Sequence, residues 1–431
     1  MIVEFNVKNF RSIKELQTIS FVATGLKSPL DSSEVDTNNI SEEGDMRLLK
    51  TIGVYGANAS GKSNIIRALE YFLQAIKNEA SSESNLSNLC DPFLYQENAF
   101  DTESYFQIVL FVRNKKYRYG FTVKRNSKVP KSPDEKISKE IIVNEWLFGT
   151  KGKNMVEYFT RKGINVEKDK LPNNEKIPSL PYEHTLFLTH SAAYDNEGDS
   201  VLIRDYIKIW ITSNFTYGVE PFRWNSLYIL ENLNKKNDFL RLLSSFNLKY
   251  DDIELDREQN KPEEFILSRD KIFMIKSYKN QNNETSTIRL NLKNNESDGT
   301  QKLFDLAGLL FLSFYIQNVS SFIVIDEIDS NFHPSLLIKL IGLFNDPLMN
   351  KSKSQLLFTS HDTNLMSPSI MRRDQFYFTE KNEDDSTKLY SLADLKGIRN
   401  DADFAKQYLA GFYGALPILE TYSNETPLQN D

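Results

Sequence analysis

The segment Gly56-Ala-Asn-Ala-Ser-Gly61-Lys62-Ser63 matches the pattern G-x-x-x-x-G-K-[ST] at every fixed position. It lies between a short β-rich run, residues 51–55, and an apolar-periodic stretch, about residues 61–77, that predicts a helix. Glycines let the backbone curl so that successive N–H groups point at phosphate oxygens, and the helix start adds the positive end of its dipole. The pattern therefore predicts a phosphate-binding loop. The alternative, a Gly-rich turn that only caps a helix, does not explain why the strand, loop and helix follow in this order.

Each residue of this loop is a candidate nucleotide contact. Lys62 would neutralise the β- and γ-phosphates, and the Ser63 hydroxyl would hold Mg²⁺. The predicted nucleotide-binding residues are Gly56, Ala57, Asn58, Ala59, Ser60, Gly61, Lys62, Ser63 and Asn64.

A second signal is the apolar run Ser321-Phe-Ile-Val-Ile-Asp326-Glu327, which ends in two carboxylates. An unbroken apolar run suits a parallel strand that is buried on both faces. Successive side chains of a strand point to opposite sides, so the two acids can do different jobs. We predict that Asp326 supports the Mg²⁺ shell and that Glu327 is the general base that polarises the attacking water. The alternative is that the acids simply end a strand at the surface.

Two weaker signals complete the set. Ser297-Asp298-Gly299-Thr300-Gln301 precedes a helical apolar run, and bare N–H groups at a helix start can bind an anion. An ordinary N-cap and turn would look the same. The strand-like stretch Gln355–Thr359 is followed by His361, which could hydrogen-bond a γ-phosphate, although a lone histidine can also be structural.

The composition excludes several classes of protein. Hydrophobic residues are 40% and charged residues 26% of the 431, and no apolar run approaches the roughly 20 residues that span a bilayer. The single cysteine, Cys90, fits a reducing cytosol, so we expect a cytoplasmic protein without a membrane partner. Four histidines and one cysteine argue against a zinc nuclease or a Cys-His hydrolase. The net charge of −7 does not indicate nucleic-acid binding, although a local basic patch remains compatible with it.

In their order along the chain, these segments resemble the ABC-type ATPase core of the SMC and RecF class. The resemblance covers about residues 1–417 and implies ATP and Mg²⁺ as cofactors, with Lys62, Glu327 and His361 as catalytic residues. It also includes Asp329 at the D-loop position, in the stretch Ile328–Pro334. The stretch Val7–Ser12 resembles the opening of that class, where the turn lies near the nucleotide, which makes Phe10 and Arg11 candidate nucleotide contacts.

A closer resemblance is to compact stand-alone ATPases of bacterial anti-phage and abortive-infection systems, such as those of the RloA, AbiL and PARIS types. It rests on the missing coiled coil between the phosphate loop and Ser297, and on the closing stretch Asp403–Pro417. It implies two ATP molecules held between two subunits, in a dimer or higher homo-oligomer, with residues 56–63 of one facing residues 297–301 of the other in trans. It also implies a separately encoded, nuclease-like effector and a phage-encoded trigger.

The alternative is a DNA-repair ATPase of the RecF kind that clamps nucleic acid. Candidate cations lie on and directly after a predicted hairpin over residues 105–123, and exposed Lys and Arg there can also be simple edge protection. These candidates are Lys115, Lys116, Lys124 and Arg125.

We therefore predict an α/β fold: a P-loop ABC-type ATPase head with an antiparallel β subdomain and an inserted α+β or helical lobe. Residues 1–90 and 296–420 would form the two halves of the ATPase core, 91–295 the inserted lobe and 421–431 a flexible tail. Within these ranges the patterns predict a polar loop over 24–46, helices over about 200–247 and antiparallel strands over 251–293. The last 130 or so residues alternate helix and strand, as a parallel sheet requires.

Overall fold

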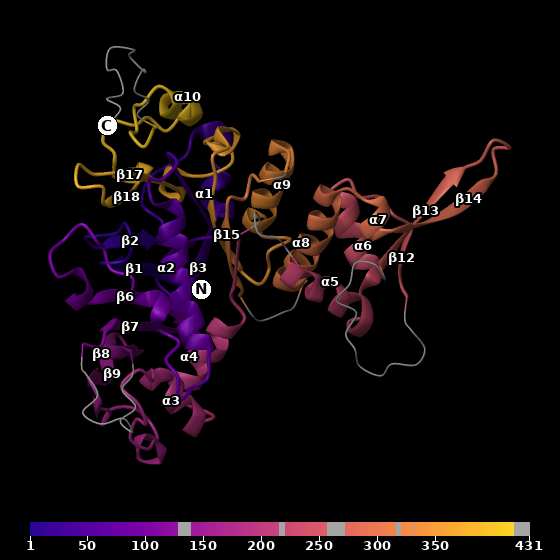
Figure 1. The fold of residues 1–431 in the computed structure, drawn as a ribbon. Helices are drawn as coiled ribbons and strands as arrows, with labels where there is room; N and C mark the ends of the chain where they lie inside the picture. The colour runs from indigo at the N-terminus through magenta and orange to yellow at the C-terminus, as the bar shows by residue number, and fades with distance from the viewer. Residues whose placement is uncertain (128–138, 215–219, 257–271, 316–319, 331, 418–431) are drawn as a thin grey trace, which may run out of the picture.

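Two large sheets with helices between and around them make up most of the molecule (Figure 1). The computed structural model describes residues 1–127, 139–214, 220–256, 272–315, 320–330 and 332–417. The tail predicted over 421–431 lies outside these residues. Within them, no helix is long and apolar enough to cross a membrane.

The first sheet carries the phosphate-loop strand. Its strands pair in parallel except for the last, which is antiparallel. Their order is β11 (Ile211–Asn214), β15 (Phe322–Asp326), β16 (Gln355–Thr359), β5 (Thr51–Gly56), β17 (Phe376–Lys381) and β18 (Thr387–Ser391). Every residue of β5, β15 and β16 is buried, as expected of strands that are covered on both faces. The carboxyl ends of these three neighbouring strands therefore meet at one edge.

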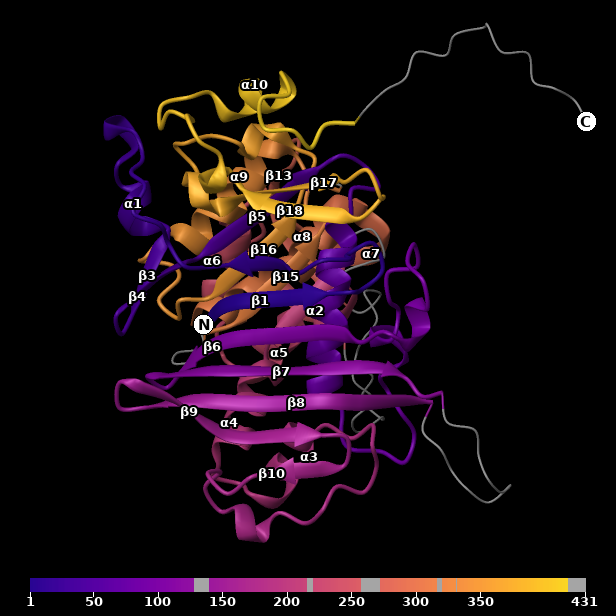
Figure 2. The ribbon, with the colours of Figure 1, turned by 90° about the vertical axis from the view of Figure 1, so that its left-hand side faces the viewer.

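The second sheet is antiparallel and faces the viewer in Figure 2. It joins the first two strands of the chain to the predicted hairpin, which is confirmed as β6 and β7. The strand order is β10 (Asn165–Glu167), β9 (Asn154–Lys162), β8 (Glu140–Lys151), β7 (Lys115–Arg125), β6 (Ser104–Val112), β1 (Ile2–Lys8) and β2 (Gln17–Ser20). Strands from both sides of residue 90 thus share this sheet.

Helix α2 (Lys62–Lys77) lies between the two sheets. Its Phe72 packs against Phe5, Phe106 and Phe121 of the antiparallel sheet, with ring centroids 5.7, 6.3 and 5.3 Å apart. The opposite face of the parallel sheet packs against α5 (Glu220–Asn232), α6 (Lys236–Ser245), α8 (Asp298–Tyr315), α9 (Pro334–Asn345) and α10 (Phe404–Leu409). Alternate residues of β15 and β16 belong to the two hydrophobic clusters, so α2 and α8 cover opposite faces of one sheet.

A smaller lobe extends beyond α6 and α8, on the right of Figure 1. It contains a three-stranded antiparallel sheet of β12 (Asp252–Leu255), β13 (Ile272–Lys279) and β14 (Thr285–Asn291), followed by the short helix α7 (Leu292–Asn295). The antiparallel strands predicted over 251–293 are confirmed in the described part of that range.

Two local predictions are wrong in part. Helices are confirmed over α4 (Asp199–Lys208), α5 and α6, but β11 interrupts them. Four residues are too few to show a period, and β11 is a strand because it pairs with β15. The polar stretch 24–46 is not a plain loop. It contains α1 (Val35–Asn38) and β3 (Ile40–Glu43), which pairs with β4 (Met46–Leu49).

The predicted α/β fold, with a phosphate-loop strand in a parallel sheet and a separate antiparallel sheet, is confirmed by this topology. The domain limits at residues 90, 295 and 420 stay a prediction.

A buried ion pair ties the antiparallel sheet to helix α3 (Phe187–Tyr194). Glu145 on β8 and Arg161 on β9 are register partners, their charged atoms are 3.1 Å apart, and both side chains are fully buried. The Glu145 carboxylate also accepts from Phe187 N at 2.7 Å and Leu188 N at 2.9 Å, at the start of α3. The guanidinium of Arg161 donates to the Glu183 carbonyl at 2.7 Å. The pair thus satisfies backbone groups as well as its own charges.

Replacing Arg161 by methionine is expected to lower the free energy of unfolding by about 3–5 kcal/mol, because a buried carboxylate would lose its counter-charge. Urea unfolding of wild type and R161M measures this. The matched control is Lys162→Met at the exposed next position of β9, which should stay within about 0.5 kcal/mol of wild type. A cost below about 1 kcal/mol for R161M would contradict the argument.

Candidate nucleotide-binding site

The phosphate loop connects β5 to α2 and is shaped by two glycines in the left-handed region. Gly56 has φ 151° and Gly61 has φ 106°. A Cβ on Gly56 would lie 2.4 Å from the Thr379 carbonyl oxygen, and one on Gly61 would lie 2.0 Å from the Thr387 Oγ1. The two glycines are therefore required both by backbone conformation and by the closeness of β17 and β18.

Threonines of β17 and β18 hold the loop through Ser60. The Ser60 and Thr379 hydroxyl oxygens are 2.6 Å apart, and Thr387 Oγ1 donates to the Ser60 carbonyl at 3.0 Å. The hydroxyls of Thr387 and Ser12 are 2.7 Å apart, and Thr387 N donates to the Ser12 carbonyl at 2.6 Å. The loop is thereby fixed to both the parallel sheet and the turn after β1.

Lys62 folds back over the loop. Its ammonium donates to the carbonyl oxygens of Gly56 at 2.8 Å and Ala57 at 2.9 Å, and the residue is only 6% exposed. Burial lowers the pKa of Lys62, and the Asp326 and Glu327 carboxylates act in the opposite direction. The ammonium therefore lies between the loop carbonyls and the acidic end of β15, where a nucleotide phosphate would compete for it.

The acidic end of β15 is fixed by a threonine at the end of β16. The Thr359 hydroxyl donates to Asp326 Oδ1 at 2.5 Å and accepts from Glu327 N at 2.7 Å. Asp326 is 3% exposed, whereas Glu327 is half-buried and has a left-handed φ of 53°. Such a conformation is uncommon for a side chain of this size and turns the chain sharply after the strand. One hydroxyl thus sets the positions of both acids.

His361 and Asp329 join this group from the next loops. His361 N donates to Asp329 Oδ2 at 3.2 Å. The pKa of the His361 imidazole is lowered, first by burial and then by the Lys62 ammonium. The nearby carboxylates, that of Asp329 foremost, act in the opposite direction. Because β5, β15 and β16 are neighbouring parallel strands, Lys62, His361 and the acids of β15 follow them at the same edge of the sheet.

The donor set fits a magnesium ion bound with a nucleotide. Mg²⁺ in such sites takes one or two protein oxygens and completes its octahedron with water and phosphate oxygens. The Ser63 hydroxyl, in the first turn of α2, and the recessed Asp326 carboxylate are oxygen ligands of this kind. Among the described residues there is no cluster of three or more His, Cys, Asp or Glu side chains that could hold a metal by itself.

The turn after β1 supports the loop from the side. Asn64 Nδ2 donates to the Ser12 hydroxyl at 2.7 Å, and Arg11 Nε donates to Asp91 Oδ2 at 2.9 Å. Phe10 is fully buried, with its ring 5.6 Å from that of Phe106. The Phe10 side chain is therefore shielded from solvent in this structure, which argues against direct contact with a nucleotide, and the predicted contact stays a prediction. Asn64 and Arg11 are already occupied by protein partners.

The segment Ser297–Gln301 lies apart from the phosphate loop of its own chain. It opens α8, on the opposite face of the parallel sheet from α2. Ser297 and Asp298 are exposed, and the Ser297 hydroxyl accepts from Thr300 N at 3.3 Å. Gln301 is instead buried, and its amide donates to the Glu296 carbonyl at 2.9 Å. The exposed part of the segment is Ser297 and Asp298. Gln301 instead stabilises the start of α8.

The structure thus brings together Lys62, Asp326, Glu327, Asp329 and His361, and it places Ser297–Gln301 elsewhere. The sequence pattern does not mark four residues that shape the site: Thr359, Thr379, Thr387 and Ser12. Thr359 could have been found, because it ends the strand that precedes His361. The others are brought to the loop only by sheet pairing.

Comparison with known proteins bears on the family. Residues 52–367 match the family model described as "AAA domain, putative AbiEii toxin, Type IV TA system". None of the curated proteins compared with the chain matches it.

Among solved structures, the chain is similar to the SMC head domain from Thermotoga maritima, with 14% identity and a TM-score of 0.42 over 90% of this chain and 98% of that one. The "recombination mediator protein RecF-ATPrS in RecFOR pathway" gives 13% identity and a TM-score of 0.32 over the same shares. Because the family model spans well over half of the residues, the chain belongs to the AbiEii-type AAA domain family.

Proposed function

We propose that this chain is a Mg²⁺-dependent ATPase whose nucleotide site is completed by a second subunit. The observation that carries the proposal is that the buried Lys62, Glu327 and His361 follow three neighbouring parallel strands, β5, β15 and β16, at the carboxyl edge of one sheet. A phosphate loop without a base would be enough to bind a nucleotide. A carboxylate held beside the phosphate lysine supports hydrolysis as well.

Each residue has a role that its surroundings support. Lys62 would exchange its loop carbonyl partners for β- and γ-phosphate oxygens, and the N–H groups of residues 57–61 would hold the same phosphates. Glu327 would accept a proton from the attacking water, and His361 would hydrogen-bond the γ-phosphate. Ser63 and Asp326 would hold Mg²⁺, which supplies neutralisation of the phosphate charge when bound.

The assembly would place the exposed Ser297 of one subunit against the nucleotide of the other. The support is that α8 and α2 lie on opposite faces of the parallel sheet, so Ser297 does not face the phosphate loop of its own chain. The γ-phosphate would then be part of the interface. ATP binding would close the dimer, and hydrolysis would loosen it. Asp329, beside His361, would lie near the junction.

We infer that this cycle serves an anti-phage or abortive-infection system, related to those of the RloA, AbiL and PARIS types. The chain would act as a sensor and scaffold that controls a separately encoded, nuclease-like effector in response to a phage-encoded trigger. The family match, whose description refers to a toxin–antitoxin system, supports this setting. Residues 91–295, which ATP chemistry needs least, are the candidate partner surface.

The competing function, a RecF-like DNA clamp, needs a continuous cationic surface. Lys115 and Arg125 lie at opposite ends of β7, about 33 Å apart at the usual rise per residue. Lys115 pairs with Asp199 at 3.2 Å, and the Arg125 guanidinium lies 4.1 Å from the Phe100 ring centroid. Both cations therefore have partners within the chain, which argues against a DNA track. β7 pairs with β6 and β8, so these cations do not protect a sheet edge either. A DNA titration at about 50 and 200 mM salt separates the functions, because a clamp must lose affinity steeply with salt.

A subunit-mixing experiment tests the shared site. Lys62→Ala and Ser297→Arg should each abolish ATP turnover alone. A 1:1 mixture should recover about a quarter of wild-type turnover, because half of random dimers are mixed and each of these has one intact site. Mixing Lys62→Ala with Glu327→Gln, both on the same side of the site, is the control without recovery. Full activity of Ser297→Arg by itself would refute the contact in trans.

A further inference from the structure

A second cavity lies at the other end of the parallel sheet. Its volume is about 420 Å³, within the range of small-molecule sites. It opens between α1, β3, β4 and the connection from α9 to β16, and Figure 2 shows α1, β3 and β4 projecting together at one side of the molecule. Four cations line it: Arg47, Lys50, Lys351 and Lys353.

Lys50 is the most unusual of the four. It directly precedes β5, is 3% exposed, and its ammonium donates to the Asn345 carbonyl at 3.3 Å. Burial lowers the pKa of Lys50 to about 8; Asp346 acts against this shift, and Lys353 adds to it. A recessed ammonium normally gathers several hydrogen-bond acceptors or a counter-ion. Among the described residues, Lys50 Nζ makes one long hydrogen bond to a carbonyl, which leaves it with capacity for further acceptors at the cavity wall.

The other cations keep charge available at the cavity wall. Within the described residues, no hydrogen bond or ion pair engages the exposed Lys351 ammonium. Arg47 donates only a 3.5 Å hydrogen bond to the Asp36 carbonyl oxygen. Lys353 pairs with Glu43 at 2.7 Å. Among the described residues, Arg47, Lys50 and Lys351 therefore form no ion pair with a carboxylate, although Asp346 acts on Lys50 at longer range.

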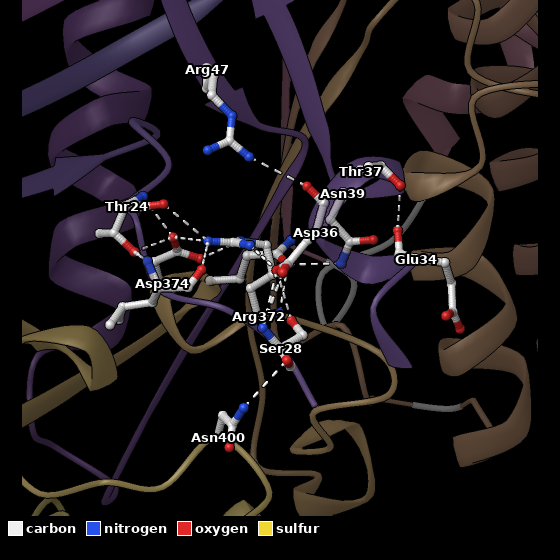
Figure 3. A network of polar contacts seen from close by, with 12 residues as sticks. Thr24, Ser28, Glu34, Asp36, Thr37, Asn39, Arg47, Arg372, Asp374 and Asn400 are labelled. Carbon is white, nitrogen blue, oxygen red and sulfur yellow. Dashed lines mark hydrogen bonds and ion pairs between the residues drawn. The ribbon is translucent and has the colours of Figure 1, made fainter. Parts of the chain in front are cut away.

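One of the two acids that line the cavity is already neutralised. Figure 3 shows the Asp36 carboxylate bound by the Arg372 guanidinium and by Ser28. Arg372, itself 2% exposed at its side chain, also holds Asp374 at 2.9 Å. Asp36 is thus a fixed part of the wall. Glu42 is the one remaining acid of the lining, so positive charge prevails in the cavity.

We propose that this cavity binds a small phosphorylated molecule through at least two phosphate groups. The volume admits a molecule of that size, and a recessed amine between flanking cations matches a compact polyanion. None of the described lining residues is aromatic, so recognition would rest on the phosphates and not on stacking of a base. A nucleic-acid backbone, which lies on exposed cations, would not reach Lys50 at the cavity floor.

This site is separate from the phosphate loop. Lys50 and Lys353 precede β5 and β16, whereas the phosphate loop and Thr359 lie at the carboxyl ends of those strands. Six residues of β5 put about 20 Å between the two ends. A ligand here and a nucleotide at the loop could therefore be bound at the same time, and the inference stands whether or not the chain hydrolyses ATP.

Calorimetric titration with sodium tripolyphosphate tests the site, with Lys62→Ala as the background in which the phosphate loop is disabled. Tripolyphosphate should still bind this variant with one site per chain. Adding Lys50→Met or Lys351→Ala should each weaken that binding about 10-fold, the effect of losing one charge-assisted contact. Replacing the exposed Lys396, which does not line the cavity, by alanine should change the affinity less than about twofold.

Three results would overturn the proposal. In the first, Lys62→Ala abolishes all tripolyphosphate binding, so that the phosphate loop is the sole site. In the second, neither Lys50→Met nor Lys351→Ala changes the affinity. In the third, a short single-stranded oligonucleotide or a glutamate peptide binds the same residues more tightly than tripolyphosphate, which would assign the surface to a macromolecule. Lys351 is exposed, so its replacement keeps the test sound even if Lys50→Met folds poorly.

Discussion

Replacing Glu327 by glutamine is expected to slow ATP hydrolysis by at least about 10²-fold while ATP binding is retained. Glutamine keeps the size of the side chain but cannot accept the proton of the attacking water. The backbone at this position is held by the 2.7 Å hydrogen bond from Glu327 N to Thr359, which the substitution leaves in place. The change therefore removes the proton acceptor and keeps the backbone contact and the size of the side chain. Because hydrolysis no longer loosens the interface, the variant should accumulate as a closed assembly with ATP.

Steady-state phosphate release and mass in solution, each with and without Mg-ATP, measure the two effects. Glu175→Gln, an exposed glutamate of the antiparallel-sheet side, is the matched control and should behave as wild type. If Glu327→Gln turns over ATP at the wild-type rate, the assigned base is wrong and the chain is better described as an ATP-dependent scaffold.

Replacing Lys62 by alanine is expected to weaken ATP binding by at least about 10²-fold. The ammonium is buried and would exchange its two carbonyl partners for phosphate oxygens, and charge-assisted contacts of this kind are worth about 1.5–3 kcal/mol each. Removing a buried charge should not unfold the protein, because burial disfavours the charged form of Lys62 in the free state.

Titration with a fluorescent ATP analogue measures the loss, and circular dichroism confirms that the variant is folded. Lys396→Ala is the control for removal of one positive charge. Nucleotide affinity within about threefold of wild type in Lys62→Ala would show that the loop backbone alone carries binding. The two variants then separate the steps: Lys62→Ala stops at binding and Glu327→Gln stops at chemistry.

The parts of the site that lie in one continuous stretch could be predicted from the sequence. The phosphate loop is such a stretch, because the strand, the glycines and the helix that shape it are neighbours in the chain. The acid pair at the end of β15 is predicted for the same reason, since four buried apolar residues lead directly to it. Their catalytic roles remain predictions that the two variants above test.

The features that the sequence pattern does not reveal depend on contacts between residues distant in the chain. Thr387 is 375 positions from Ser12, and the pair meets only because β18 closes one edge of the parallel sheet. Phe10 is a candidate nucleotide contact by its sequence pattern, but its ring packs against Phe106 and Tyr71 and is not exposed to solvent. β11 has no pattern of its own. Tertiary pairing decided each of these positions.

The place of β11 has a mechanical meaning. Within the described part of the range 91–295, only the four residues of β11 pair with the parallel sheet. The last of them, Asn214, is the register partner of Asp326. A protein that binds α4 or α5 would therefore act on a strand that is hydrogen-bonded to β15, the strand that ends in Asp326 and precedes Glu327. A displacement of these helices would be transmitted to Asp326 by the backbone hydrogen bonds between β11 and β15, independently of contacts to a nucleotide.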